Sequence, residues 1–215
     1  MTDERATGLI LRTYPLTETS LIIHWLTREQ GRLATVAKGA RRPKSPFRGK
    51  LDLYFLADFS FLRSRRSQLH TLREIVLRDT HPALRTDIGC LQQAAYGSGL
   101  IEKFTETDTP LPGCFQIFSD WLRLLSQPRP PQHTALIFET KLLVEFGLAP
   151  DPRQTPLSAG AKAVLQKWIE TDWAALERLH LSEDQKFEIE AFLGRHLAQQ
   201  LGQLLPTRAH ALHPY

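Results

Sequence analysis

The chain contains little cysteine: it has two residues of this type, Cys90 and Cys114, and they form no CxxC pair. Such usage is typical of a reducing compartment and leaves no zinc-site spacing. The N-terminus, MTDERATG, has no apolar signal core, and no apolar run approaches the roughly 18 residues of a membrane helix. We therefore expect a cytoplasmic protein with no membrane partner, in which both cysteines are small buried hydrophobic residues.

Signatures of catalysis are missing as well. The sequence has no GxxxxGK[ST], no GxSxG and no HExxH, and it offers no cluster of carboxylates. His210 and His213 lie three residues apart, but no cysteine or carboxylate accompanies them as a metal ligand would require. We expect no enzymatic activity, no cofactor and no metal site.

Charge is distributed unevenly along the 215 residues, which carry a net charge of +4. Residues 1–80 hold 15 Lys/Arg and 8 Asp/Glu, a net charge of +7, so the remainder carries −3. A change of sign along a chain long enough for two small domains indicates two units with different partners. We predict one domain at residues 1–79 and a second at residues 80–215.

The basic residues are densest between Lys38 and Lys50, where six lysines and arginines stand without one acidic residue. Prolines and glycines in this run exclude a long helix or a central strand, so it is predicted to be a loop. Lysine and arginine neutralise phosphates, which favours a polyanion as ligand. A solvated surface loop that happens to be basic is the alternative.

Alternating and β-branched residues predict five strands in the first 80 residues, at 7–14, 19–27, 33–37, 51–62 and 68–77. In the first of them, Leu9, Leu11 and Thr13 share one face and Ile10 and Arg12 the other. Gly31 supplies a turn with positive φ. Short strands joined by short turns predict a small closed or half-closed barrel such as the OB-fold, which often binds oligonucleotides.

After residue 80 the hydrophobic period becomes helical. Ile88, Leu91, Ala95 and Gly99 fall on one predicted face, and further helices cover 115–125 and 136–144, the latter ending at Gly147. Ser158 is expected to cap the next helix. Ser182 with Gln185 matches a capping box ahead of a helix through Leu205. The fold class is therefore α+β, a β-barrel followed by an all-helical domain.

Several strings in the sequence resemble the RecO family of DNA repair proteins. The most specific is VAKGARRPKS at 36–45, and it is accompanied by GLILRT at 8–13, ETSLI at 18–22, LTREQGR at 26–32, TLRE at 71–74, FETKLL at 138–143 and FGLAP at 146–150. The resemblance runs from about residue 7 to about residue 150 and is weaker beyond.

The resemblance implies an N-terminal OB-fold, a helical domain, and a non-enzymatic role in bacterial recombinational repair at the nucleoid. Such proteins bind single- and double-stranded DNA, anneal complementary strands, work with RecR, contact the C-terminal tail of the single-stranded DNA-binding protein SSB, and help load RecA. Many members carry a four-cysteine zinc site after the FGLAP position. Residues 151–157 contain no cysteine, so we expect no zinc here.

The residues expected to contact DNA lie on two basic turns: Lys38, Arg41, Arg42, Lys44, Phe47, Arg48 and Lys50 on the first, and Arg63, Arg65 and Arg66 on the second. Phe47 either stacks on a base or tucks back onto the barrel. Arg12 and Arg32 are weaker candidates. Aromatics of a dense apolar run and of the second helix are expected in cores rather than on binding surfaces: Tyr54, Phe55, Phe59, Phe61, Phe115, Phe118 and Trp121.

Binding of the acidic, aromatic-ended SSB tail would need a cation beside an apolar pocket. The candidate cations in the helical half are Lys103, Arg123 and Lys141. Two other functions stay open on the residues alone. One is an RNA-binding OB module of translation or RNA processing, for which phosphate contacts and stacking would serve equally. The other is a metal-dependent nuclease.

Overall fold

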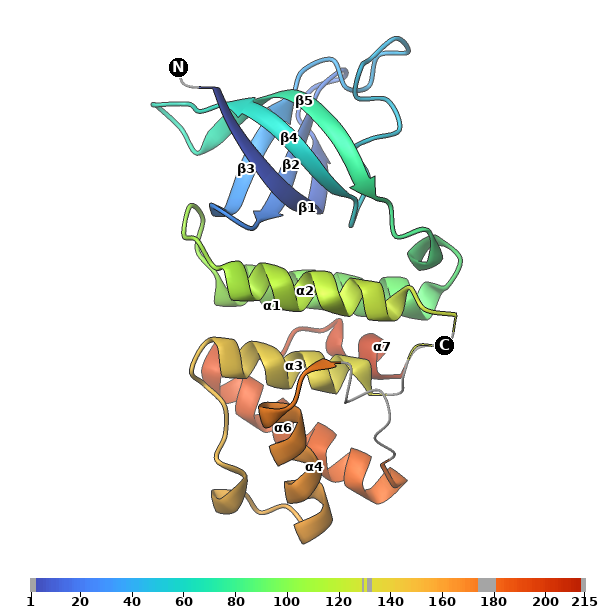
Figure 1. Cartoon of the computed structure of the whole chain (residues 1–215), viewed down its shortest axis with the longest axis vertical. Coiled ribbons are helices and arrows are strands. Elements are labelled where there is room, and N and C mark those ends of the chain that lie inside the picture. The colour runs from blue at the N-terminus through green and yellow to red at the C-terminus, as the bar shows by residue number, and fades with distance from the viewer. Residues whose placement is uncertain (1–2, 129, 131–132, 174–180, 214–215) are drawn as a thin grey trace. The chain divides into compact units, whose positions relative to one another are not determined.

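The computed structural model of the chain describes residues 3–128, 130, 133–173 and 181–213. Contacts divide the chain into two compact units. The barrel unit comprises residues 1–81 and 105–119, and the helical unit comprises residues 82–104 and 120–215. Figure 1 shows the path of the chain within each unit.

The barrel unit is built from β1 (Asp3–Pro15), β2 (Leu21–Thr27), β3 (Gly31–Ala37), β4 (Leu56–Leu62) and β5 (Leu69–Asp79). They close in the order β1–β2–β3–β5–β4. All neighbours are antiparallel except β3 and β5, which run parallel over a short register from Ala34 to Val36. Closure leaves no sheet edge exposed, which is the physical advantage of a barrel. The predicted α+β class with an N-terminal five-stranded barrel is confirmed.

Alternating side chains of these strands fill the barrel. Trp25 stacks on Phe59 with ring centroids 4.0 Å apart, and its indole N–H donates to the Thr35 hydroxyl over 2.9 Å. The aromatics that were expected in the core are there: Tyr54, Phe55, Phe59 and Phe61 are all buried, as are Phe115, Phe118 and Trp121. These rings are therefore packing groups and not exposed binding platforms.

The predicted alternation in β1 is wrong at one point. The register with β2 shifts between Ile10 and Arg12, so Leu11 is an extra residue in a β-bulge. Leu9, Ile10 and Leu11 are consequently all buried, although the simple two-face pattern separates Ile10 from the other two. Beyond the bulge Thr13 lies opposite Ile23, a residue of the barrel core.

The predicted strand at 51–62 is too long. Only Leu56–Leu62 is β-strand, because Tyr54 adopts a positive φ of 63° that interrupts the extended chain. The Tyr54 N–H donates to the Ile10 carbonyl over 2.7 Å, and the Ile10 N–H donates to the Phe55 carbonyl over 3.1 Å. These bonds hold the irregular segment against β1. The predicted turn at Gly31 is confirmed, with φ of +69° and the Thr109 carbonyl where a Cβ would lie.

The helical unit contains η1 (Pro82–Arg85), α1 (Ile88–Phe104), the second part of α2 (Pro112–Leu125), α3 (Thr134–Glu145), η2 (Pro152–Gln154), α4 (Ala159–Glu170), α6 (Glu183–Leu201) and α7 (Arg208–Leu212). Three predicted termini are confirmed: Ser158 caps α4, Ser182 and Gln185 form the capping box of α6, and Gly147 follows α3 with φ of +68°. Residues 174–180 of the expected all-helical part lie outside the described residues.

Two helical predictions are wrong in detail. α6 ends at Leu201 and not at Leu205, because Gly202 takes the left-handed conformation that terminates helices. In α1 the predicted apolar face is buried only in part: Ile88 and Ala95 are exposed, Leu91 is half-buried and Gly99 is buried. The buried face includes Cys90, Ala94 and Tyr96 instead. Later in α1 the chain packs closely at Gly99, where an added Cβ would lie 3.1 Å from Leu205.

A buried ionic cluster ties three helices of this unit together. Glu139 on α3 is fully buried and accepts hydrogen bonds from the Arg208 guanidinium on α7 at 2.8 and 3.0 Å. The Tyr96 hydroxyl on α1 donates to the same carboxylate over 2.5 Å, and burial beside Glu139 raises the pKa of Tyr96 well above its usual value. The described helices include none that is long and apolar enough to cross a membrane.

Candidate nucleic-acid interface

The basic loop (residues 38–50) leaves β3 and is a chain of tight turns. Backbone hydrogen bonds of 3.0–3.2 Å link Arg42 to Gly39, Ser45 to Arg42, Arg48 to Ser45 and Lys50 to Phe47. Gly39 and Gly49 both have a φ of 71°, a conformation that glycine adopts without steric cost. The predicted loop is thus an ordered structure, built from the glycines and prolines that exclude a helix.

Two apolar side chains pin this loop to the barrel. Phe47 is 6% exposed and Ala40 is 9% exposed, and both belong to the core that includes Trp25 and Phe59. Of the two alternatives for Phe47, the ring tucks back onto the barrel. It therefore presents no face to a base in this conformation, and its contribution to the surface is to hold the cations in place.

The cations of the basic loop point outward. Lys38, Arg41, Arg42, Lys44 and Arg48 are exposed, and Lys50 is half-buried. None of the six forms an ion pair with a carboxylate of the described residues. Two acidic residues flank the region, Glu18 and Asp52, and both are exposed. Six cations without carboxylate partners in the described residues, carried on a hydrogen-bonded series of turns, make a surface suited to phosphates.

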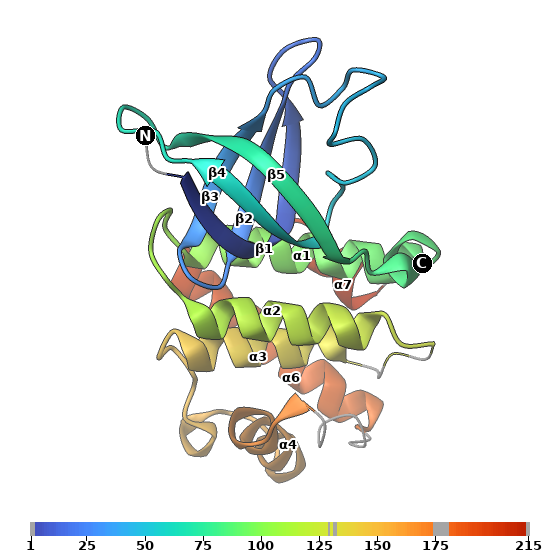
Figure 2. The ribbon, with the colours of Figure 1, turned by 45° about the horizontal axis from the view of Figure 1, so that its top comes forward.

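The β1–β2 turn (residues 16–20) lies against the basic loop. The Arg41 N–H donates to the Thr19 carbonyl over 3.0 Å, and the Gly39 N–H donates to the Ser20 hydroxyl over 3.4 Å. The Arg41 guanidinium also reaches the Thr17 carbonyl at 3.5 Å. In Figures 1 and 2 both segments emerge from the same end of the barrel. This turn holds no lysine or arginine, so its sequence carries no sign of a place in the candidate site.

The second basic turn, the β4–β5 turn (residues 63–68), has a different environment. Arg63 donates to Glu4 at 2.7 Å and to Asp108 at 3.2 Å, and it also bonds Gln30. The guanidinium lowers the pKa of the Glu4 carboxyl through this hydrogen bond. Arg63 is thus engaged within the barrel unit, and only Arg65 and Arg66 are exposed at the tip.

The two basic turns do not flank a common surface. In both views of the ribbon the β4–β5 turn emerges beside the start of β1, away from the basic loop (Figures 1 and 2).

The two weaker candidates for DNA contact, Arg32 and Arg12, have different surroundings. Arg32 donates to the Thr105 hydroxyl over 2.7 Å and to the Thr105 carbonyl over 2.5 Å, so it fastens a neighbouring segment. Arg12 is half-buried on the outer face of β1.

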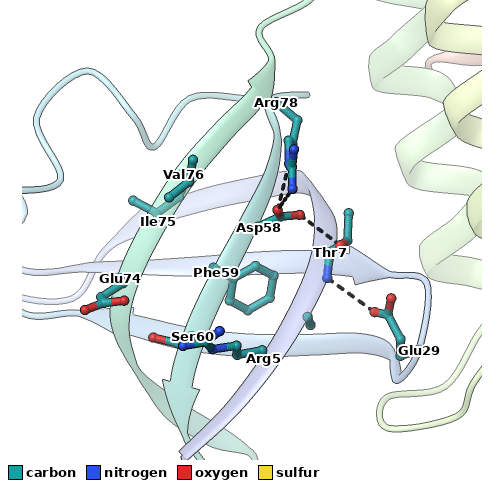
Figure 3. A pocket seen from close by; sticks show the side chains of 11 residues that line it. Arg5, Thr7, Glu29, Asp58, Phe59, Ser60, Glu74, Ile75, Val76 and Arg78 are labelled. Atoms are coloured by element: carbon teal, nitrogen blue, oxygen red, sulfur yellow. Dashed lines mark hydrogen bonds and ion pairs between the residues drawn. The ribbon is translucent and has the colours of Figure 1, made fainter.

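A further hollow of about 530 Å³ lies on the outer side of β1, β4 and β5 (Figure 3). Arg78 donates to Asp58 over 2.6 Å, the Thr7 hydroxyl donates to Asp58 over 2.9 Å, and these contacts lower the pKa of Asp58. Glu29 and Glu74 add two more carboxylates to its lining. Its charges are mixed and partly neutralised, so it suits a polyanion less well than the basic loop does.

The three candidate cations of the helical unit differ in their availability. Lys103 is exposed on α1, and Arg123 is exposed but pairs with Asp120 at 2.8 Å. The Lys141 ammonium donates to the Thr171 carbonyl over 2.5 Å, and burial lowers its pKa.

The two cysteines are buried, as expected, and burial raises the pKa of Cys90 to about 11. Within the described ranges no three His, Cys, Asp or Glu side chains gather as metal ligands.

The segment at the expected zinc position is a compact capped turn. Asp151 accepts a hydrogen bond from the Arg153 N–H over 2.9 Å and begins η2. Pro152, Thr155 and Leu157 are buried, and Leu157 belongs to the core of the helical unit. Leu157 therefore anchors this cysteine-free segment to the helical unit.

Comparison with known proteins gives a consistent result along most of the chain. Residues 1–81 match the family model described as "Recombination protein O N terminal", and residues 85–155 match "Recombination protein O C terminal". Three similar curated proteins are each named "DNA repair protein RecO". The protein of Exiguobacterium sibiricum is 32% identical over 147 residues, and that of Azoarcus sp. is 37% identical over 146 residues. The protein of Bacillus subtilis is 24% identical over an alignment of 233 residues.

The coverage of these matches differs. The first two alignments include 68% and 67% of this chain but 58% of each relative. The third includes 94% of this chain and 91% of the relative. The closed barrel and the two family models together identify the class as a two-unit protein with an N-terminal OB-fold and a helical second unit. The chain belongs to the RecO family.

Proposed function

We propose that this protein is a non-enzymatic mediator of recombinational DNA repair in the bacterial cytoplasm, and that it binds single- and double-stranded DNA through the basic loop. The observation that carries the proposal is a group of six cations without carboxylate partners in the described residues, five of them exposed and Lys50 half-buried, on a loop held by the buried Phe47. Membership of the RecO family supports a repair role. Annealing follows from the same surface, because cations screen the repulsion between the phosphates of two strands.

The decisive experiment reverses three charges of the loop in the variant Arg41→Glu, Arg42→Glu, Lys44→Glu. Binding to a labelled single strand is then measured as a function of salt concentration. Loss of three phosphate contacts should weaken binding and reduce the slope of log K against log salt by about 2. The matched control reverses three exposed cations of the helical unit, Arg153, Lys167 and Arg195, and so changes net charge equally. If the two variants bind the strand with the same affinity and the same salt slope, the assignment of the basic loop is contradicted.

The mediator role has separate tests. Annealing of complementary strands should proceed without nucleotide hydrolysis, so ATP turnover by the purified protein would count against it. RecR and the SSB tail are proposed partners, and with them the loading of RecA onto SSB-coated strands. Among the candidate cations for the tail, Lys103 is exposed, whereas the Lys141 ammonium donates to the Thr171 carbonyl. Binding of an SSB-tail peptide to the variants Lys103→Glu and Lys141→Glu shows which of the two lysines contributes, because only the variant of a contacting lysine should lose affinity.

An RNA-binding role is the second candidate, since phosphate contacts do not discriminate between the nucleic acids. Competition between DNA and RNA strands of the same sequence separates the two, because a contact to the 2′-OH gives preference for RNA. Equal or stronger binding of DNA favours the repair role.

A further inference from the structure

One row of side chains crosses the outer surface of three strands next to the basic loop. In the register of the barrel Tyr14 on β1 lies opposite Ile22 on β2, and Ile22 lies opposite Val36 on β3. Their neighbours Ile23 and Ala37 belong to the barrel core, so the alternation of the strands turns Ile22 and Val36 to the outer face. Ile22 is half-buried there, and Val36 is only 7% exposed. Directly opposed residues on one face are in side-chain contact range. The three residues form one continuous strip, named here the outer row.

Tyr14 supplies the aromatic end of the outer row. It is 43% exposed, whereas every other Phe, Tyr and Trp side chain in the described part of the barrel unit is buried. The ring meets His24 edge to face, with centroids 5.4 Å apart and planes inclined by 75°. The His24 imidazole therefore contacts the tyrosine ring and leaves it 43% exposed. Leu16, two residues later, is 46% exposed.

A hollow of about 460 Å³ adjoins this row, between the β1–β2 turn and the start of the basic loop. Leu16 and Val36 give it apolar walls, and Lys38 and Arg42 supply two cations. Thr17 and Ser20 add hydroxyl groups. The turn and the loop that border it are joined by the hydrogen bonds from Arg41 and Gly39 to Thr19 and Ser20, so the hollow has a defined shape.

These features match the chemistry of an unpaired nucleotide. A nucleobase has flat apolar faces and polar edges, and it is linked to a phosphate. The Tyr14 ring, which belongs to the outer row and not to the lining of the hollow, suits the face of a base. In the hollow the apolar walls and hydroxyl groups suit the rest of the nucleotide, and Lys38 with Arg42 suit the adjoining phosphates. A base within a duplex is stacked and paired, and it cannot enter such a site without being extruded at a cost of a few kcal/mol.

We propose that the outer row and this hollow bind one unpaired base of single-stranded DNA, with Tyr14 as the stacking residue. The proposal rests on the proposed function of the basic loop and adds to it a preference for single over double strands. The cations would contribute to binding both forms, whereas Tyr14 would contribute only where a base is free.

The test compares Tyr14→Ala and Tyr14→Phe with the unaltered protein on a labelled thymidine strand of about 20 nucleotides and on a duplex of the same length. Loss of one stacked base predicts that Tyr14→Ala binds the single strand about 5- to 140-fold more weakly. Duplex affinity and the salt slope should stay unchanged, because no phosphate contact is lost. Tyr14→Phe should bind like the unaltered protein. Phe187→Ala, which removes an exposed aromatic of the helical unit, is the matched control.

Two outcomes overturn this inference alone. The first is unchanged single-strand affinity in Tyr14→Ala, and the second is an equal loss on single strand and duplex, which would mean that Tyr14 only shapes the loop. If reversal of Arg41, Arg42 and Lys44 leaves affinity unchanged, the proposed function itself fails. Ultraviolet crosslinking of a 5-iododeoxyuridine strand to the unaltered protein needs no variant, and the crosslink should map to Tyr14. A stronger effect of Tyr14→Ala on RNA than on DNA would assign the site to RNA instead.

Discussion

Arg41 donates its backbone N–H to the carbonyl of Thr19 over 3.0 Å, and this bond joins two segments that are 22 residues apart in the sequence. The basic loop is therefore fixed at its first half to the β1–β2 turn, while Phe47 fixes its second half to the barrel core. A surface of like charges repels itself, so such anchors are needed to hold its cations together before any polyanion is bound.

The side-chain bond in this junction can be removed singly. Ser20→Ala deletes the hydroxyl that accepts from the Gly39 N–H, at a cost of about 0.5–1.5 kcal/mol in the free energy of unfolding. Hydrogen exchange of the Gly39 amide should become faster, and DNA affinity should fall. Ser126→Ala, which removes a hydroxyl bonded to the Leu122 carbonyl in the helical unit, is the control and should leave Gly39 unchanged. An unaltered Gly39 exchange rate in Ser20→Ala would contradict the anchoring role.

We expect Phe47 to contribute to DNA binding through packing. Phe47→Ala should lower the free energy of unfolding by about 3–5 kcal/mol, because it empties a buried site in the core. Phe47→Leu retains most of the apolar volume, and we expect it to keep single-strand affinity close to that of the unaltered protein. Chemical denaturation and strand-binding titrations of both variants measure this. A large loss of affinity in a stably folded Phe47→Leu would instead indicate that the ring stacks on a base.

Removal of one charged partner from the ionic cluster of the helical unit should lower the free energy of unfolding strongly. Glu139→Gln leaves the Arg208 guanidinium buried without its counter-charge, so we expect a loss of about 3–5 kcal/mol in stability. Adding Arg208→Met to this variant removes the orphaned charge and should recover part of the loss. Urea denaturation of the single and double variants measures both effects. A double variant that is less stable than Glu139→Gln would show that the charge is not the cause.

Stability of the barrel unit should depend on pH through His70. Burial lowers the pKa of His70 below its usual value of about 6.5, and the Arg63 guanidinium at 3.4 Å adds to the effect. As pH falls through about 6.5 the unfolded chain binds a proton that the folded chain does not, so the free energy of unfolding decreases by up to about 1.4 kcal/mol per pH unit.

Denaturation between about pH 7.5 and 5.5 tests this dependence in a window above the carboxyl pKa values. His70→Gln should flatten the profile relative to the unaltered protein. His133 has a pKa lowered by burial as well, so part of the slope should persist and should disappear in the His70→Gln, His133→Gln variant. An identical profile in all three proteins would contradict the assignment.

Much of the architecture was predictable because it depends on neighbouring residues. The barrel class follows from short alternating segments, and the caps at Ser158 and Ser182 follow from local hydrogen bonding. The predictions failed where a distant contact overrides the local pattern. The bulge at Leu11 depends on the pairing of β1 with β2, and the break at Tyr54 depends on hydrogen bonds to Ile10 on another strand.

The candidate site divides in the same way. Its cations, its loop character and the family resemblance could be read from residues 36–45. The sequence could not show which cations are available to a ligand. Arg63, for example, bonds Glu4, Gln30 and Asp108, which are far away in the sequence. The sequence also could not show that Tyr14 is exposed. In a strict two-residue alternation Tyr14 and Ile10 lie on the same face of the strand, and Ile10 is buried.

The sequence by itself determined the chemistry of this protein: a basic loop with no acidic residue, a barrel-forming alternation and a helical second half without cysteine ligands. The tertiary structure decided which of these groups face outward. Burial of Phe47, engagement of Arg63 and the junction of Arg41 with Thr19 all arise from chain closure, which brings together residues that local sequence patterns do not relate.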